Sequence, residues 1–387
     1  MDQYPRLVLL LVLSCLCSAT LAADRMMMEV TIAGRTAHLA LDTAAEPLCL
    51  FDAGARRLGL EIEPPASDVP AAPGGVVPGR TEECDIAIGP NSGRLRLPVV
   101  PLPGYIEPDV DGLIGWDVLR RFVIRIDAVH QKVSVANQVP PEALNWPCWK
   151  IRPDARRLVV EIPTHEPVPE TIMIDTGSPS GVMLAPQRWQ QWTEAHPHQP
   201  ATLDASFFPG IGIVVSEERW ARTFALGEMA FHEVPVGDYT AMIQHFPGQR
   251  HAATLGLRAV RRLSWLIDAP NGKVYFQSHG SPAGPNTYEY NRLGAVFVPG
   301  DGQGDVLVAH VVQGGPAHRA GIRDGDRLLR IDELDVTKWR TDPRILPLSR
   351  FWSRPAGTAL GLGLQRDEKT LDVTAVLEDI FPTRFGN

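Results

Sequence analysis

The segment Thr171-Ile172-Met173-Ile174-Asp175-Thr176-Gly177-Ser178 places a carboxylate between an apolar run and a Thr-Gly turn. The run before Asp175 predicts a strand, because apolar and β-branched residues predominate in it. A carboxylate at the end of a buried strand needs a partner, since an isolated buried charge is costly. Asp-Thr-Gly alone also fits an ordinary Asx-type turn. A second aspartate in a matching context is therefore what distinguishes a site from a turn.

Such a second aspartate lies near the N-terminus. Residues 28–32 and 38–41 predict a strand, a turn at Gly34 and a second strand, and Asp42-Thr43-Ala44 follows directly. An apolar pair comes shortly after each aspartate, Leu50-Phe51 in the first case and Met183-Leu184 in the second. The first copy differs from the second in having Ala44 where the second has Gly177.

The two aspartates belong to an internal repeat. Residues 115–128 recur without gaps as residues 256–269, an offset of 256 − 115 = 141, and each stretch begins with Gly and contains Arg-Arg and a later Asp-Ala. The aspartates are separated by 175 − 42 = 133 residues, so the second copy is longer by eight residues before its glycine. Matches in the same order and register favour two homologous segments over chance.

Paired carboxylates would explain this arrangement chemically. Two carboxylates about 3 Å apart repel by roughly 5 kcal/mol at an effective dielectric constant near 20, so both do not ionise together. They share one proton, and one acts as general acid while the other acts as general base on a water between them. The sequence thus predicts Asp42 and Asp175 as a catalytic pair.

Each copy also has a glycine-rich stretch between apolar residues. Residues 73–77 contain Gly74 and Gly75, and residues 209–213 contain Gly210 and Gly212. These glycines are candidates for flaps that close over a cleft. Ordinary surface turns explain the same composition.

The composition and the N-terminus indicate an exported soluble protein. The chain has 387 residues, 44% of them hydrophobic, and a formal net charge of −8, which argues against general binding to nucleic acids or anionic membranes. Arg6, the apolar run of residues 7–13 and small residues up to Ala23 predict a signal peptide over residues 1–23. The expected location is the periplasm or the extracellular space, without a transmembrane span after cleavage. A lipid anchor on Cys15 is the minor alternative.

Linkers divide the rest of the chain. Residues 136–150, with Pro140-Pro141, predict a connector between the copies, and residues 277–291 a second linker rich in Gly, Pro and Ser. The expected domains are residues 24–138, 150–278 and 290–380. Residues 186–195 predict a helix in which Trp189 and Trp192 serve core or interface packing rather than ligand binding.

The apolar-Asp-Thr-Gly pattern, followed by Leu113-Ile114-Gly115 and a short helix and strand, resembles the retropepsin-like and pepsin-like aspartyl proteases over residues 26–276. The resemblance implies a mostly β fold of two retropepsin-like β-barrel lobes in pepsin-like tandem, each contributing one catalytic aspartate. It further implies that Thr43 and Thr176 interlock beneath the pair, and that Gly115 and Gly256 pack beside it. Ala44 and Gly177 complete the supporting residues.

The C-terminal residues resemble a PDZ domain, on the motif Gly315-Pro316-Ala317, then Ala320-Gly321-Ile322, then Gly325-Asp326. In that family a loop binds a peptide's terminal carboxylate through backbone N–H groups. The matching stretch here is Arg292 to Ala295, and a groove helix is expected between Pro343 and Trp352. The peptide-binding residues implied are Leu293, Gly294, Ala295, Val296, Ile345 and Leu348. A domain that only packs against its neighbours or organises oligomers is the alternative.

Other chemistries lack their motifs. The sequence has no Gly-x-Ser-x-Gly, no His-Glu-x-x-His and no pattern marking a Ser-His-Asp arrangement, and neither a metal nor another cofactor is expected. Three cysteines follow the signal peptide, so at least one is unpaired, and a bridge from Cys49 to Cys84 is a guess.

The resulting interpretation is an exported aspartic endopeptidase that acts on peptide or protein substrates and whose PDZ domain binds peptide C-termini or regulates the enzyme. A catalytically weak or inactive peptide-binding adaptor remains an alternative. A pair formed by the second copies of two molecules is a further one.

Overall fold

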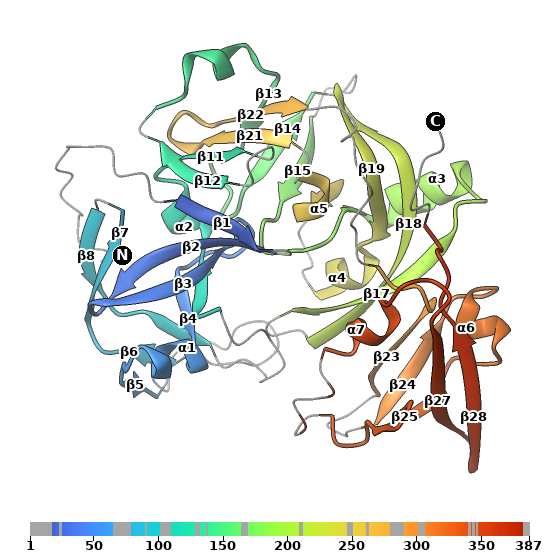
Figure 1. Ribbon diagram of the computed structural model, residues 1–387. Coiled ribbons are helices and arrows are strands. Elements are labelled where there is room, and N and C mark those ends of the chain that lie inside the picture. The colour runs from blue at the N-terminus through green and yellow to red at the C-terminus, as the bar shows by residue number, and fades with distance from the viewer. Residues whose placement is uncertain are drawn as a thin grey trace. The chain divides into compact units, whose positions relative to one another are not determined.

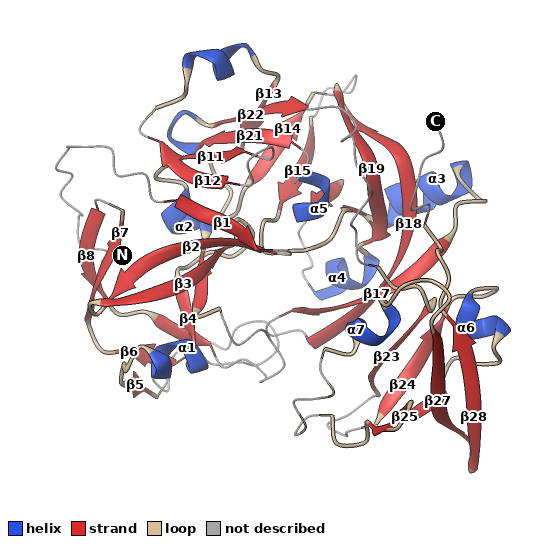
Figure 2. Cartoon of the chain, in the orientation of Figure 1, coloured by secondary structure: helices blue, strands red, loops and turns tan. Residues whose placement is uncertain are grey.

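The computed structural model describes residues 18–22, 25–64, 79–89, 91–100, 110–127, 132–136, 138–163, 169–208, 212–245, 251–260, 263–278, 290–300, 306–339, 342, 345 and 347–381. Strands predominate and the helices are short (Figure 2), which confirms a mostly β protein. None of the helices in these ranges is long and apolar enough to cross a membrane.

The chain divides into two compact units. The first comprises residues 1–102, 107–180 and 254–280, and the second comprises residues 103–106, 181–253 and 281–387. The domain boundaries expected from the sequence remain predictions.

The first repeat lies in the first unit and is drawn from blue to green in Figure 1. Its elements are β1 (Ser18–Ala22), β2 (Arg25–Ile32), β3 (Arg35–Leu41), β4 (Cys49–Phe51), α1 (Asp52–Arg57), β5 (Ile62–Glu63), β6 (Gly79–Thr81), β7 (Cys84–Ile88), β8 (Asn91–Leu95), β9 (Pro98–Val100), β10 (Gly112–Ile114), α2 (Trp116–Leu119), β11 (Val123–Asp127) and β12 (Lys132–Ala136).

Strands β2 and β3 form the predicted hairpin. They pair antiparallel around a turn at Ala33-Gly34, where both residues have positive φ. Buried and more exposed residues alternate along β2, as expected for a strand with one face on the core. Strand β10 then runs parallel to β3, with Ile114 opposite Leu41, so Leu113-Ile114-Gly115 lies beside the end of β3.

A buried carboxylate holds β10 in this position. Asp111 is 2% exposed, and its side chain accepts hydrogen bonds from the guanidinium of Arg57 and, at 2.7 Å, from the backbone N–H of His38. Its own backbone N–H donates to the carbonyl of His38 at 2.8 Å. These bonds offset the cost of burying the charge and fix the register of β10 on β3.

The second repeat contributes elements to both units. In the first unit are η1 (Pro141–Asn145) from the connector, β13 (Cys148–Ile151), β14 (Val159–Ile162), β15 (Glu170–Ile174), β20 (Ala253–Leu255) from Thr254 on, α5 (Leu257–Val260), β21 (Leu263–Asp268), η2 (Ala269–Asn271) and β22 (Lys273–Ser278). Helix α5 and strand β21 follow Gly256 as α2 and β11 follow Gly115, which matches the sequence repeat.

Equivalent strands of the two repeats pair with each other. Strands β11 and β21 are antiparallel, and Arg125 lies opposite Leu266. These residues differ by 266 − 125 = 141, the offset of the repeat, so each is the other's counterpart. The ladder therefore has a local two-fold axis at this pair, the arrangement of an isologous interface.

The second unit begins with β16 (Val182–Leu184), α3 (Pro186–Ala195), β17 (Ala201–Phe208), β18 (Gly212–Leu226), β19 (Met229–Asp238) and α4 (Thr240–His245). Strands β17, β18 and β19 form an antiparallel meander, and β16 is parallel to β19. Helix α3 has the predicted bounds, and its Trp189 and Trp192 rings stack with centroids 5.8 Å apart.

The C-terminal part of the second unit is a separate sheet with its own core, drawn from orange to red in Figure 1. Its elements are β23 (Ala295–Pro299), β24 (Leu307–Val311), α6 (Pro316–Arg319), β25 (Arg327–Ile331), β26 (Leu334–Asp335), α7 (Ser349–Trp352), β27 (Ala359–Arg366) and β28 (Lys369–Val376). The sheet order is β23-β24-β25-β27-β28, with β26 on β25, so β23 is an edge strand.

The expected Gly-Asp turn introduces β25. Gly325 has φ +85°, a conformation that favours glycine. Asp326 is 1% exposed and accepts hydrogen bonds from Arg366 at 2.7 and 2.8 Å. This bidentate pair ties the turn to the end of β27.

Candidate active site

Asp42 and Asp175 occupy equivalent positions at the ends of strands. Asp42 follows β3 and its backbone N–H donates to the carbonyl of Ile114 at 3.0 Å. Asp175 follows β15 and its N–H donates to the carbonyl of Leu255 at 2.9 Å. Ile114 and Leu255 are themselves equivalent in the repeat, so each aspartate is anchored by the strand that precedes its repeat's glycine.

The two glycines predicted beside the aspartates are required by close packing. A Cβ on Gly115 would lie 2.4 Å from the carbonyl oxygens of Glu46 and Pro47, and one on Gly256 would lie 2.4 Å from the carbonyl oxygen of Ser180. These contacts are far below van der Waals distance. Each glycine thus lets α2 or α5 begin directly against the loop that follows its aspartate.

Each carboxylate is held by its own loop in the same way. Oδ1 of Asp42 accepts hydrogen bonds from the N–H groups of Ala44 and Ala45 at 2.9 and 2.8 Å. Oδ1 of Asp175 accepts from Gly177 and Ser178 at 2.9 and 3.1 Å. Backbone donors aimed at one oxygen fix the orientation of the carboxyl group and favour its charged form.

The threonines after the aspartates bind each other reciprocally. The N–H of Thr43 donates to Oγ1 of Thr176, and the N–H of Thr176 donates to Oγ1 of Thr43, both at 3.1 Å. The hydroxyl of Thr43 donates to the carbonyl of Ile174 at 2.6 Å, and that of Thr176 donates to the carbonyl of Leu41 at 2.7 Å. The four bonds cross between the repeats and tie the two aspartate loops into one buried network.

The carboxyl group of Asp42 lies against the loop of Asp175. A Cβ on Gly177 would be 2.4 Å from Cγ and from Oδ2 of Asp42. Neither Gly177 nor Ala44 has a positive φ, so backbone strain at these two positions is absent. Glycine is needed at position 177 because of this contact, and the alanine at position 44 is compatible with its own backbone conformation.

Burial and mutual repulsion favour a shared proton. The pKa of Asp175 is raised from 3.8 to about 7, first by burial and then by the negative charge of Asp42. Burial also raises the pKa of Asp42, although the N–H groups of Ala45 and Ala44 and the charges of Arg157 and Arg25 oppose the shift. Asp175 therefore keeps a proton up to near neutral pH beside the negative charge of Asp42.

Sequence patterns did not single out the basic and thiol groups around the pair. Arg157 lowers the pKa of both aspartates, and the next residue, Leu158, donates from its N–H to the carbonyl of Thr43 at 2.9 Å. Cys49 is buried, and burial together with Asp42 raises the pKa of its thiol to about 12. Cys49 and Cys84 are both free, so the guessed bridge between them is wrong. Arg157 lies between β13 and β14, where no repeat or motif marks it.

The remaining candidate residues are placed as follows. Gly74, Gly75 and Gly210 lie outside the described residues, and Gly212 is the first residue of β18. Leu293, Gly294, Ala295 and Val296 are buried at the start of β23. Ile345 is fully buried in the core of the C-terminal sheet, with Leu348 packed against that core.

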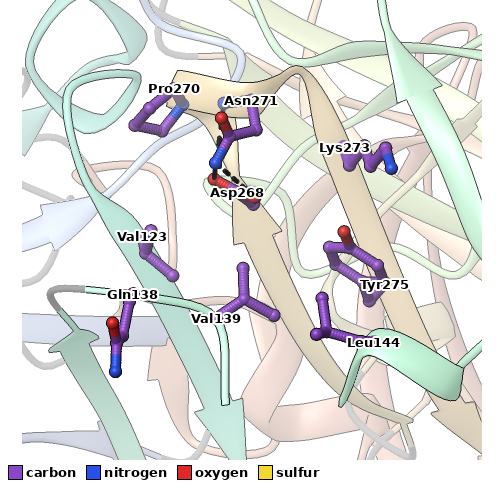
Figure 3. A pocket seen from close by; sticks show the side chains of 9 residues that line it. All are labelled: Val123, Gln138, Val139, Leu144, Asp268, Pro270, Asn271, Lys273 and Tyr275. Carbon is purple, nitrogen blue, oxygen red and sulfur yellow. Dashed lines mark hydrogen bonds between the residues drawn. The ribbon is translucent and has the colours of Figure 1, made fainter. Parts of the chain in front are cut away.

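A cavity of about 480 Å³ lies elsewhere in the first unit (Figure 3). Its lining includes Asp268, whose carboxylate accepts hydrogen bonds from the side-chain amide of Asn271 at 3.0 Å. The residues that line it are Val123, Gln138, Val139, Leu144, Asp268, Pro270, Asn271, Lys273 and Tyr275. None of them is a residue of the aspartate loops, so this cavity is separate from the candidate active site.

Comparison with known proteins addresses the C-terminal part of the chain. No curated protein matches the chain. Residues 286–346 match the PDZ domain family, which confirms the identification made from the Gly-Pro-Ala and Gly-Asp motifs. The chain therefore contains a PDZ domain, which points to peptide binding or to regulation.

Proposed function

We propose that this chain is an exported aspartic endopeptidase that hydrolyses peptide bonds with Asp42 and Asp175. The observation that carries the proposal is the reciprocal bonding of Thr43 and Thr176 within one chain. This bonding joins the two aspartate loops, with the Asp42 carboxyl against the Gly177 backbone, and so supports a pair of carboxyl groups. An arrangement made within one chain favours an intramolecular pair over one formed between two molecules.

The fold that suits this proposal is a tandem of two retropepsin-like lobes. The self-equivalent pair Arg125 and Leu266 supports it, because a two-fold relation between the repeats also relates the aspartates. The equivalent bonds made by Asp42 and Asp175 support it independently.

The chemistry assigns different roles to the two carboxyl groups. Asp42, as the ionised base, takes a proton from a water, whose oxygen then bonds to the carbonyl carbon of the scissile peptide. Asp175, protonated up to about pH 7, gives its proton to the carbonyl oxygen. The proton now on Asp42 passes to the leaving nitrogen as the carbon–nitrogen bond breaks, and the hydroxyl returns its proton to Asp175 as the new carboxyl group forms. Neither a metal nor an organic cofactor is required by these steps.

Export and the PDZ domain complete the proposal. The apolar run of residues 7–13 supports a signal peptide. Cleavage near Ala22 or Ala23 removes β1, which pairs with β12 and β2. The pairing of β2 with β3, which leads to Asp42, runs from Met27–Ala40 to Ile32–Arg35 and does not involve β1. The PDZ domain supplies peptide binding or regulation for the enzyme.

The test is cleavage of a diverse peptide library by the mature chain, with fragments identified by mass spectrometry between pH 3 and pH 8. Asp42→Asn and Asp175→Asn should each abolish cleavage, because one carboxyl group alone cannot act as both acid and base. Asp117→Asn is the matched control, since Asp117 lies in α2 with a half-exposed side chain 3.9 Å from Arg120. Cleavage that persists in Asp42→Asn would contradict the intramolecular pair.

The second candidate function is peptide binding without hydrolysis. Ala44 favours it, because the methyl group breaks the symmetry of the two loops at the catalytic pair. This candidate predicts that the library peptides bind to the wild-type chain but remain intact at every pH tested.

A further inference from the structure

The segment that enters the PDZ domain is bonded to the β17–β18 hairpin of the same unit. Asn291 is 8% exposed, and its Nδ2 donates to the carbonyl of Leu203 in β17 at 2.9 Å. The hydroxyl of Thr202, also in β17, donates to the backbone carbonyl of Asn291 at 2.7 Å. Both strands of the hairpin contact the edge strand β23.

An aromatic cluster adds a second attachment next to Asn291. The ring of Tyr290 packs on Phe381, with centroids 4.8 Å apart, and Phe381 packs on Trp220 of β18 at 5.5 Å. All three side chains are buried. The entry to the PDZ domain is therefore fixed to the hairpin by hydrogen bonds to β17 and by apolar packing on β18.

The same Asn291 side chain occupies the loop that would bind a peptide carboxylate. Its Oδ1 accepts from the N–H of Leu293 at 2.9 Å and from the N–H of Gly294 at 3.2 Å. Its Nδ2 also donates to the carbonyl of Ala295 at 2.8 Å. Consecutive backbone N–H groups that converge on one oxygen form an anion-binding nest, and here an uncharged amide oxygen of the chain fills it.

We propose that the Asn291 side chain is an internal occupant of the PDZ carboxylate site, and that a peptide C-terminus binds by displacing it and loosens β17 from the PDZ domain. Each N–H group donates one good hydrogen bond, so Leu293 and Gly294 cannot serve Asn291 and a carboxylate together. Rotation of the amide out of the nest also breaks its bond to Leu203. Peptide binding and attachment of the hairpin thus oppose each other, and the coupling is reciprocal.

The ligand class follows from the site. A carboxylate carries a full negative charge and has two oxygens for the N–H groups, so it competes well with a neutral amide oxygen. The edge strand β23 offers main-chain groups for a peptide added as a further strand. The expected ligand is therefore an extended peptide with a free C-terminus, and the same peptide with a C-terminal amide should bind weakly. This inference is independent of the aspartates.

The first experiment measures binding of fluorescein-labelled octapeptides that end in Leu, Val or Phe, as free acids and as amides, by fluorescence anisotropy with the full chain. Asn291→Ala should bind the free acids about ten-fold more tightly than the wild type. Thr202→Val, which loses only the bond to the Asn291 carbonyl, should give a smaller gain, and Asn271→Ala in the first unit should give none. Equal binding by wild type and Asn291→Ala, no binding by either, or an equal gain for the amides overturns the proposal.

The second experiment keeps the wild-type sequence and measures hydrogen exchange at residues 201–208 by mass spectrometry. A saturating free-acid octapeptide should speed exchange in β17, and the amide at the same concentration should not. Exchange in β17 that is unchanged or slowed by bound free-acid peptide overturns the coupling. This readout holds even if Asn291→Ala folds poorly.

Discussion

Replacing Asp175 by Asn should stabilise the first unit at neutral and alkaline pH. Asparagine keeps an oxygen that accepts from the N–H groups of Gly177 and Ser178, so the loop is preserved. It removes a carboxyl group whose charged form is disfavoured by burial and by Asp42. The substitution therefore changes the electrostatics of the site and little else.

The size of the stabilisation expected for Asp175→Asn follows from proton linkage. Between pH 3.8 and about 7 the unfolded chain has released the Asp175 proton and the folded chain keeps it, so stability falls as pH rises through this window. A shift of roughly 3 pKa units at about 1.4 kcal/mol per unit gives about 4 kcal/mol, lost fully above pH 7. Below pH 3.8 the carboxyl group is neutral in both states, so the contribution is intact and the variant gains nothing.

The assay is thermal unfolding of the wild type and Asp175→Asn at pH 3.5, 5.5 and 8, with Asp117→Asn as control. For a unit of about 200 residues, about 4 kcal/mol raises Tm by roughly 8–16 °C at pH 8. The gain should shrink at pH 5.5 and vanish at pH 3.5. A gain that is independent of pH, or a variant less stable than the wild type at pH 8, would refute the electrostatic reasoning.

Two further predictions concern the loops around the pair. Thr176→Val should lower the free energy of unfolding by about 2–5 kcal/mol and abolish cleavage, because the Thr43 N–H and the Leu41 carbonyl lose their hydrogen-bond partner. Thr176→Ser should retain most of the stability and most of the activity. Urea unfolding and cleavage rates of the two variants test this, and equal behaviour of the two would contradict it. Gly177→Ala should reduce cleavage by roughly 100-fold, since its Cβ would displace the Asp42 carboxyl group, while Ala44→Gly should cleave at least as fast as the wild type. Steady-state cleavage rates of Gly177→Ala and Ala44→Gly test this prediction. A loss of activity in Ala44→Gly would contradict it and would show that the methyl group is required.

Sequence reasoning reached the parts of the fold that repeat or carry a motif. The offset of 141 residues already relates Arg125 to Leu266, and the structure pairs them. The hairpin before Asp42 followed from alternation and a glycine turn, and the PDZ domain followed from spaced glycines. The hairpin and the PDZ motif are local features, whereas the pairing of Arg125 with Leu266 could be anticipated because the repeat itself relates the two residues.

Features that depend on contacts distant in sequence were not predictable in this way. The need for glycine at position 177 comes from its contact with the Asp42 carboxyl and not from a positive φ. The two residues are 177 − 42 = 135 positions apart in the sequence. Arg157 influences the aspartates from the segment between β13 and β14, and Asn291 precedes the loop whose N–H groups it occupies. No periodicity or motif marks either residue, because their partners become neighbours only in the folded chain.

The most direct test of the central claim mixes two inactive chains. Asp42→Asn and Asp175→Asn are each assayed alone and then together at equal concentration against the peptide library, beside the wild type over a hundred-fold range of concentration. If both aspartates act within one chain, the wild type cleaves with a constant specific activity and the mixture is as inactive as its components. Cleavage restored in the mixture, or a wild type that leaves every peptide intact, would contradict it.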